Sequence, residues 1–189
     1  IIQRDYAHGR KDGKSNEIRK NLIKDIKICL EGDLVMDFNF VYGTVANGIF
    51  YPVDGQQRLT TLYLLHWFLA CNCGRFHEFS NLKGFSYMTR NSAAEFFALM
   101  KQPDTKLKDY AKGSVNLREE IEKQPWFQVE WGYDPTVDSV LTFLSDLSVD
   151  QDFRRNAARY YSRLECGAIT FHHIVEEGSG AEEKAAKSY

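Results

Sequence analysis

Apolar side chains recur at helical spacing in three stretches of the chain. Residues 16–30 are amphipathic and residues 55–71 are apolar nearly all round, which predicts one surface helix and one central, buried helix. Asp134-Pro135 is typical of an N-cap followed by proline at the first helical position, and a third apolar stripe follows it. The apolar positions of the first and third stretches are Ile18, Leu22, Ile23, Ile26, Leu30, Val137, Val140, Leu141, Leu144 and Leu147.

Two shorter runs of β-branched and aromatic residues predict a hairpin. Residues 40–45 and 49–53 flank Ala46-Asn47-Gly48. Asn-Gly between two such runs favours a tight turn, because both residues tolerate a positive φ. The second predicted strand runs directly into the buried helix.

The remaining pattern completes an α+β fold. Residues 1–6 predict the end of a strand, residues 150–164 a helix and residues 168–175 a final apolar strand. We therefore expect a small strand-rich unit over residues 1–72 and a mainly helical extension over residues 73–189 that packs on it. The chain opens on isoleucine and ends in a polar run, so we also expect it to be a piece of a longer protein.

Composition narrows the class of protein. The 189 residues carry 24 Lys+Arg against 26 Asp+Glu, which argues against a binder of nucleic acid or membranes that works through net charge alone. With 43% hydrophobic residues, the chain is folded rather than disordered. No apolar run reaches the roughly 18 residues of a membrane span. No signal peptide is visible either, so we expect a cytoplasmic protein without a membrane partner.

The cysteines indicate neither a disulfide framework nor a metal site. The four cysteines are sparse and lie mostly within apolar stretches, as reduced cysteines do. Cys71-Asn72-Cys73 with His77 has tighter spacing than zinc sites use, and no second ligand pair follows at a familiar distance. We expect no protein-held metal.

The residues best suited to chemistry directly follow the second hairpin strand. Gly55 allows backbone or ligand to approach closely, and the free N–H groups of the helix that begins there favour an anion. Arg58 adds a planar cation suited to bidentate phosphate contacts, and Thr60 and Thr61 add hydroxyls one turn further on. Together they predict a small phosphate-binding site without a Walker loop.

A purely structural interpretation of the same residues is open. Asp54 and Gln57 have the N-cap and N3 spacing of a capping box, and Arg58 can pair with a surface carboxylate. Asp54 would also repel a phosphate unless a cation such as Mg²⁺ lies between them. Spacing alone does not decide between the two interpretations.

Two segments stand out by their order along the chain: Gln3-Arg4-Asp5-Tyr6 and, after a helix and a hairpin, Val53-Asp54-Gly55-Gln56-Gln57-Arg58-Leu59-Thr60-Thr61-Leu62. The pair resembles the signatures of a large prokaryotic family typified by the S half of GmrSD, a type IV modification-dependent restriction system. The resemblance covers residues 1–70. It departs from the family pattern at Ile1-Ile2 and Ala7-His8, where members usually have a proline with an aromatic residue and a tryptophan, respectively. The family's later Asn-x-x-Gly signature is not found.

The resemblance implies a ParB/sulfiredoxin-like fold in which a strand, a turn and a helix bind nucleotide phosphates. It also implies that NTP binding or hydrolysis is coupled to DNA restriction in phage defence. The resemblance places Asp54, Gly55, Gln56, Gln57 and Arg58 in the nucleotide site, with Gln3 and Arg4 on the adjacent strand end. We predict that Asp54 and Gln57 are catalytic and position Mg²⁺ or the attacking water, because phosphoryl transfer mostly needs positioning and charge neutralisation. With the hydroxyls of the residue pattern added, the predicted nucleotide-binding residues are Gln3, Arg4, Gly55, Gln56, Arg58, Thr60 and Thr61. The implied partners are a nucleotide, DNA and a nuclease domain or subunit.

The leading hypothesis is a nucleotide-binding, NTP-hydrolysing regulatory domain of a bacterial restriction-like defence protein. One alternative is a non-enzymatic, ParB-like module that senses nucleotide or DNA. Another is direct contact of the glycine-arginine segment with a DNA backbone. No nuclease-like constellation surrounds His172-His173, so we expect no nuclease site in this chain.

Overall fold

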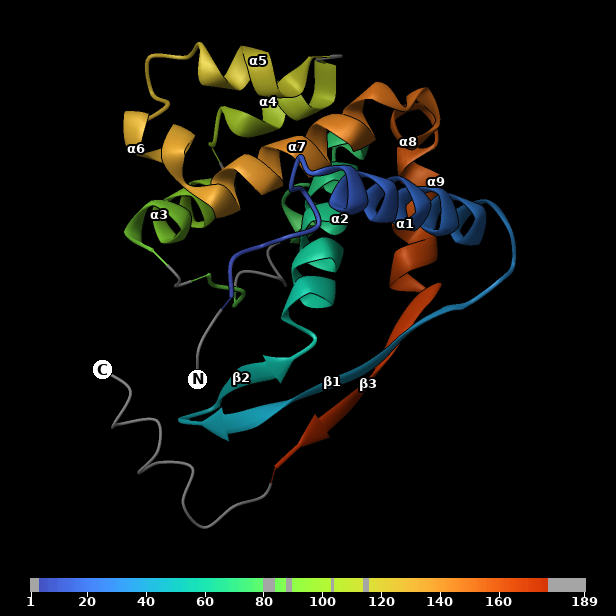
Figure 1. Ribbon diagram of the computed structural model, residues 1–189. Coiled ribbons are helices and arrows are strands. Elements are labelled where there is room, and N and C mark those ends of the chain that lie inside the picture. The colour runs from blue at the N-terminus through green and yellow to red at the C-terminus, as the bar shows by residue number, and fades with distance from the viewer. Residues whose placement is uncertain (1–3, 80–83, 88–89, 103, 114–115, 177–189) are drawn as a thin grey trace.

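The computed structural model describes residues 4–79, 84–87, 90–102, 104–113 and 116–176. In these ranges the chain forms a three-stranded mixed sheet and a larger group of helices beside it (Figure 1). The α+β class predicted from the pattern of apolar residues is confirmed.

The predicted hairpin is formed by β1, Met36–Ala46, and β2, Ile49–Asp54, which pair antiparallel. Asn47 and Gly48 make the turn with φ values of 51° and 73°. These left-handed values match the right-handed twist of the two strands, which is why Asn-Gly is favoured at such turns.

The third strand comes from the other end of the chain. β3, Ile169–Val175, pairs parallel to β1, so the strand order is β2-β1-β3 with β1 in the centre. The predicted final strand is thus confirmed. The predicted strand end over residues 1–6 is wrong where the structure describes it, because residues 4–6 belong to no strand of the sheet.

α2, Gln56–Cys73, is the central helix, and it runs from the end of β2 into the helical layer (Figure 1). It is buried on nearly all sides, as its apolar composition predicts. Trp67 is completely buried, and its indole N–H donates to the carbonyl of Met100 at 2.9 Å. The helix ends at Gly74, whose N–H donates to the carbonyl of Ala70.

The other two predicted amphipathic helices are also present. α1, Gly13–Glu31, begins after Asp12, whose carboxylate accepts a hydrogen bond from the N–H of Ser15. α7, Pro135–Val149, begins after Asp134, which caps the N–H groups of the first turn with Pro135 at the first helical position. Proline needs no N–H acceptor there, so the sequence signal and the structure agree.

The remaining helices pack around α2 and α7. They are α3 Asn91–Met100, α4 Leu107–Gly113, α5 Leu117–Glu122, α6 Val129–Tyr133, α8 Gln151–Arg155 and α9 Ala157–Glu165. The single helix predicted over residues 150–164 is therefore two helices that meet at the non-helical Asn156. The predicted boundary at residue 72 stays a prediction, and both the sheet and the hydrophobic core cross it.

Candidate functional site

The N-terminal segment, residues 4–8, lies along the first two turns of α2 (Figure 1). The side chain of Gln57 binds the backbone of this segment at Asp5 and Ala7. The amide oxygen accepts a hydrogen bond from the N–H of Ala7 at 2.7 Å, and the amide nitrogen donates to the carbonyl of Asp5 at 2.9 Å. These side-chain bonds satisfy backbone groups that a sheet would otherwise pair, so the segment is fixed without being a strand. Both polar atoms of the Gln57 side chain are used in this contact.

Gln56 and Tyr87 fix the backbone of Arg4 from two sides. Gln56 Oε1 accepts from the Arg4 N–H at 2.9 Å, while Gln56 Nε2 donates to the carbonyl of Pro52 at 2.8 Å. The Tyr87 hydroxyl donates to the carbonyl of Arg4. The Arg4 side chain itself is exposed, and its guanidinium makes no hydrogen bond or ion pair within the ranges described above. A fixed backbone with an unengaged cation suits anion binding.

Arg58 is the second cation at the start of α2. Its Nη1 donates to the carbonyl of Phe38 in β1 at 2.7 Å, and its Nη2 pairs with Asp54 Oδ2 at 3.0 Å. The ion pair that the structural interpretation expected is therefore present, with Asp54 as the carboxylate. The side chains of Arg58 and Asp54 are 30% and 69% exposed. Because exposed pairs of this kind contribute little to stability, a phosphate can compete with Asp54 for Nη2.

Gly55 turns the chain from β2 into α2. Its φ is 85°, and a Cβ there would lie 2.9 Å from Val41 Cγ2 and 3.1 Å from Val41 Cα. Only glycine adopts this backbone freely and leaves that space empty. Gly55 is also the N-cap residue, and no side chain caps the helix. The capping box expected for Asp54 and Gln57 is thus absent, because Asp54 is still extended as the last residue of β2.

The first turn of α2 presents backbone N–H groups without helical acceptors. The helical ladder starts with the Leu59 N–H, which donates to the carbonyl of Gly55 at 3.0 Å. The N–H groups of Gln57 and Arg58 precede this ladder and have no helical acceptor four residues back, and no side chain caps the helix. The helix dipole adds partial positive charge at this end. An anion is the ligand that such an end favours.

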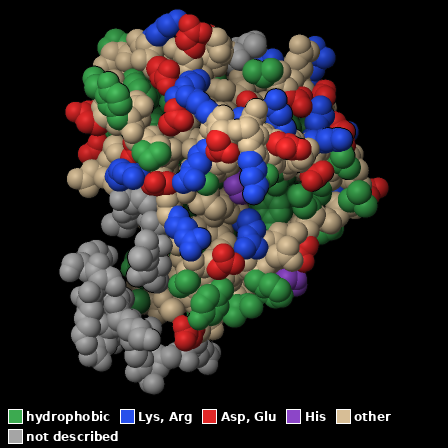
Figure 2. Space-filling model, in the orientation of Figure 1, with side chains coloured by type: hydrophobic (Ala, Val, Ile, Leu, Met, Phe, Trp, Pro, Cys, Tyr) green, Lys and Arg blue, Asp and Glu red, His purple; other side chains and the backbone are tan. Residues whose placement is uncertain are grey.

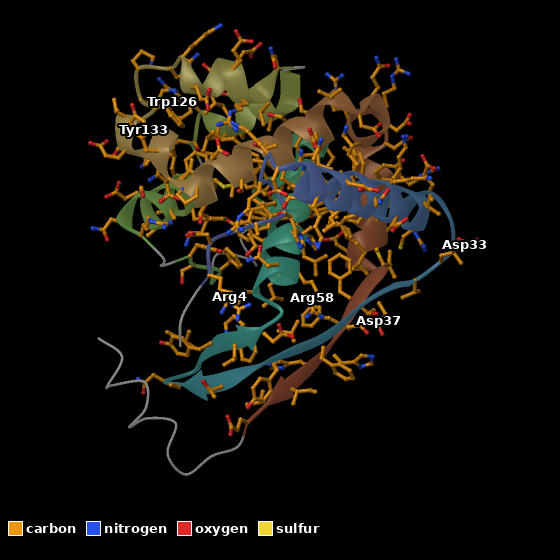
Figure 3. The ribbon with its side chains drawn as sticks, in the orientation of Figure 1. Arg4, Asp33, Asp37, Arg58, Trp126 and Tyr133 are labelled. Carbon is orange, nitrogen blue, oxygen red and sulfur yellow. The ribbon has the colours of Figure 1, made fainter. Side chains whose placement is uncertain are left out.

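The two predicted arginines flank this helix end. Figure 3 shows Arg4 and Arg58 on either side of the start of α2, between the sheet and the helices. Figure 2, in the same orientation, shows Lys and Arg side chains on this face with an acidic side chain beside them. The structure therefore brings together Arg4, Asp54, Gly55, Gln56, Gln57 and Arg58. Gln3 lies outside the described residues.

Thr60 and Thr61 lie inside the protein. Thr60 Oγ1 donates to the carbonyl of Gln56 at 2.8 Å. Thr61 Oγ1 is 3.0 Å from the hydroxyl of Tyr6 and 2.9 Å from Nδ1 of His8. Both threonines are buried, so in this arrangement their hydroxyls support α2 and the N-terminal segment from within.

Two residues from the helical portion also contact the N-terminal segment. Arg90 pairs with the carboxylate of Asp5, and Thr136 of α7 donates to that carboxylate at 3.3 Å and accepts from the N–H of Tyr6 at 3.3 Å. The ion pair with Asp5 raises the pKa of the Arg90 guanidinium. Arg90 and Thr136 are 85 and 131 residues from Asp5 along the chain. No local spacing pattern could therefore have paired them with Asp5.

The family of the chain is shown by a comparison with protein-family models. The model described as GmrSD restriction endonuclease, N-terminal domain, matches residues 1–184. The chain belongs to this family. Comparisons with curated proteins and with solved structures gave no match. The resemblance carried by the two N-terminal signatures is confirmed, and the match extends it over the helical portion.

A GmrSD N-terminal domain is part of a restriction-type phage-defence protein, and this assignment holds for the chain. The ParB/sulfiredoxin-like superfamily implied by the same resemblance stays a prediction. Within the described ranges, no three His, Cys, Asp or Glu side chains are placed to hold a metal ion. None of the helices in those ranges combines the length and apolar character needed to cross a membrane.

His8 is a candidate site residue of this GmrSD N-terminal domain, although the sequence pattern did not single it out. Burial lowers the pKa of its imidazole, and the nearby charge of Arg58 lowers it further. Burial also raises the pKa of the Tyr6 hydroxyl far above its ordinary value of 10.0. Both side chains are therefore uncharged at neutral pH. In the sequence, a lone histidine between two polar segments gives no signal that it belongs to a functional site.

We expect acid to destabilise the GmrSD N-terminal domain below about pH 6.5. Burial lowers the pKa of His8 and of His66, whose Nδ1 is 2.8 Å from the carbonyl of Leu62, below the ordinary 6.5. The unfolded chain then binds protons that the folded protein does not. The free energy of unfolding is therefore highest above about pH 6.5. It decreases as the pH falls from there to the lower pKa values of the two histidines in the folded protein.

Urea denaturation across this pH range measures the effect. His66→Gln should flatten the pH dependence of the unfolding free energy, because one buried group that the unfolded chain protonates is gone. An identical pH dependence in His66→Gln and the wild type would contradict a lowered pKa of His66 in the folded protein.

Proposed function

We propose that this domain binds a nucleotide by its phosphates at the start of α2 and hydrolyses it, as the regulatory part of its restriction system. One observation carries the proposal: the uncapped first turn of α2 lies between two arginines whose side chains reach solvent. Backbone donors, a helix dipole and planar cations are the groups that bind phosphate in proteins.

The two arginines have different roles in this proposal. Arg58 is held by the carbonyl of Phe38, so its Nη2 is presented in a fixed direction. The phosphate takes the place of Asp54 at that nitrogen. Arg4 reaches the phosphates from the N-terminal segment, whose position depends on Gln56 and Gln57. Because both amide atoms of Gln57 are used there, we assign Gln57 a positioning role and leave contact with water or metal to Asp54.

Mg²⁺ fits the site as a companion of the nucleotide. Mg²⁺ is usually bound by one or two carboxylates together with substrate phosphates, and it keeps several waters. Asp54 supplies one exposed carboxylate beside the cations, and the described residues offer no cluster that would hold the ion alone. When bound, Mg²⁺ would neutralise charge on the phosphates. The chain's own contribution is to position the phosphates and Asp54.

Hydrolysis is tested by phosphate release from ATP and GTP, with and without DNA. We expect release above background that depends on Mg²⁺ and is lost in Asp54→Asn. The same variant should bind nucleotide more tightly than the wild type when Mg²⁺ is absent, because a repelling carboxylate is gone. Equal Mg²⁺-free affinities would contradict the place given to Asp54.

A non-enzymatic sensor is the second candidate function. It is favoured by the engagement of Gln57, because both amide atoms of this side chain bind the N-terminal segment and do not orient a water. This function predicts nucleotide binding without phosphate release, in the presence or absence of DNA. The same assay therefore separates the two functions.

A further inference from the structure

We propose that His8 is a further phosphate-binding residue of this site, held as a neutral imidazole that donates a hydrogen bond from Nε2. This inference rests on the proposed function, because it adds a ligand to the same phosphate site. It is carried by a chain of three side chains, Tyr6, Thr61 and His8, between the N-terminal segment and α2.

The chain of hydrogen bonds fixes where the imidazole proton lies. The Tyr6 side chain is completely buried, and within the described ranges its hydroxyl has one hydrogen-bond partner, Thr61 Oγ1 at 3.0 Å. A buried hydroxyl proton without an acceptor is costly, so Tyr6 donates to Thr61. The single proton of the Thr61 hydroxyl then goes to Nδ1 of His8 at 2.9 Å. An Nδ1 that accepts leaves the ring proton on Nε2.

The surroundings of the ring exclude the doubly protonated form. Arg58 faces His8 from α2. Arg19 of α1 donates to the His8 carbonyl at 3.3 Å, and its own charge is paired with Asp146 of α7. The Tyr6 ring lies 5.7 Å away and stays uncharged. A second ring proton would add a cation beside Arg58 and break the bond from Thr61.

Nε2 is the free end of this arrangement. His8 is half-buried, and its Nε2 has no hydrogen-bond partner in the ranges that the structure describes. Thr61 follows Arg58 by three residues on α2, so the two lie on the same face of the helix. The imidazole is thus held on the helix face that carries Arg58. We assign its Nε2–H to a phosphate oxygen, next to the contacts from Arg58.

A neutral donor differs from a catalytic base in what it predicts. The Nδ1 lone pair is occupied by Thr61 and Nε2 carries a proton, so His8 has no free lone pair with which to take a proton from water. Its contact with phosphate should therefore be constant from about pH 8 to about pH 6.5. A general base would instead give a rate that falls with its own pKa.

The experiment measures binding of MgATP and of inorganic triphosphate to the full chain. His8→Leu should weaken binding about 10-fold, since a hydrogen bond to a charged group is lost. His8→Gln, which keeps a donor at a similar reach, should restore most of the affinity. Thr61→Val releases Nδ1, so its affinity should rise as the pH falls from about 7.5 to about 5.5 relative to the wild type.

Nitrogen NMR of the His8 ring provides a second measurement that needs no variant to fold. The expected signature is a protonated Nε2 and an unprotonated Nδ1, with Nε2 shifting when triphosphate is added. A protonated Nδ1, or wild-type affinity in His8→Leu while the wild type binds, would overturn the role of His8 alone. If the wild type binds neither probe, the proposed function fails and this role fails with it.

Discussion

Gly9→Ala should destabilise the protein by about 3 kcal/mol or more, a large effect for one methyl group. Gly9 is buried directly after the N-terminal segment, and its backbone lies against α7. A Cβ there would lie 1.7 Å from the carbonyl oxygen of Ser139, 2.3 Å from its carbonyl carbon and 2.4 Å from its Cα. All three atoms belong to the backbone of a helix. The clash is therefore relieved only if the segment leaves α7.

The same substitution should also impair the phosphate site, because Gly9 directly follows the N-terminal segment, which contains Arg4 and His8. Gly13→Ala is the matched control. Gly13 is the first residue of α1, and a Cβ there would meet nothing within 4 Å. Alanine also favours a helix more than glycine does. Urea denaturation of both variants decides the point. Equal unfolding free energies for the two variants would contradict the close packing of Gly9 on α7.

The local elements of the site follow from sequence, because their causes are local. The Asn47-Gly48 turn needs positive φ, and the helix over residues 56–73 is apolar nearly all round. Both features are visible in a window of a few residues. Gly55 and Arg58 could also be named in advance, since a glycine at a strand-to-helix junction and an arginine one turn on are recognisable by spacing.

The contacts that hold the site together could not be predicted, because they join distant parts of the chain. Gln57 binds the backbone of Asp5 and Ala7, about 50 residues earlier. The residues next to Gln57 in the sequence do not indicate this contact. The spacing of Asp54 and Gln57 suggested a capping box instead. That prediction was wrong because β2 extends through Asp54, so a left-handed Gly55 is needed before the helix begins.

His8 and the parallel pairing of β3 with β1 are further examples. His8 acquires its partners only when the N-terminal segment lies on α2, and β3 reaches β1 across more than 120 residues. Interactions of this kind depend on the whole fold. The family match is consistent with the two signatures read from the sequence, but those signatures do not describe how their side chains are engaged.

Arg58→Ala should weaken nucleotide binding about 10- to 100-fold, the largest effect on function that we expect. Hydrogen bonds to charged groups contribute about 1.5–3 kcal/mol, and Arg58 offers its Nη2 to phosphate from a position fixed by Phe38. Arg58→Lys keeps the charge but loses the planar donor geometry, so its nucleotide affinity should lie between that of the wild type and that of Arg58→Ala. Removal of an exposed ion pair costs little stability, so the variant should remain folded.

The most direct measurement is a titration of a fluorescent nucleoside triphosphate into the wild type, Arg58→Ala and Arg155→Ala. Arg155 is an exposed arginine at the end of α8 and serves as the control for loss of one positive charge. We predict that Arg58→Ala binds about 10- to 100-fold more weakly than the wild type, while Arg155→Ala binds like the wild type. Unchanged affinity in Arg58→Ala, or an equal loss in both variants, would contradict a phosphate site at the start of α2.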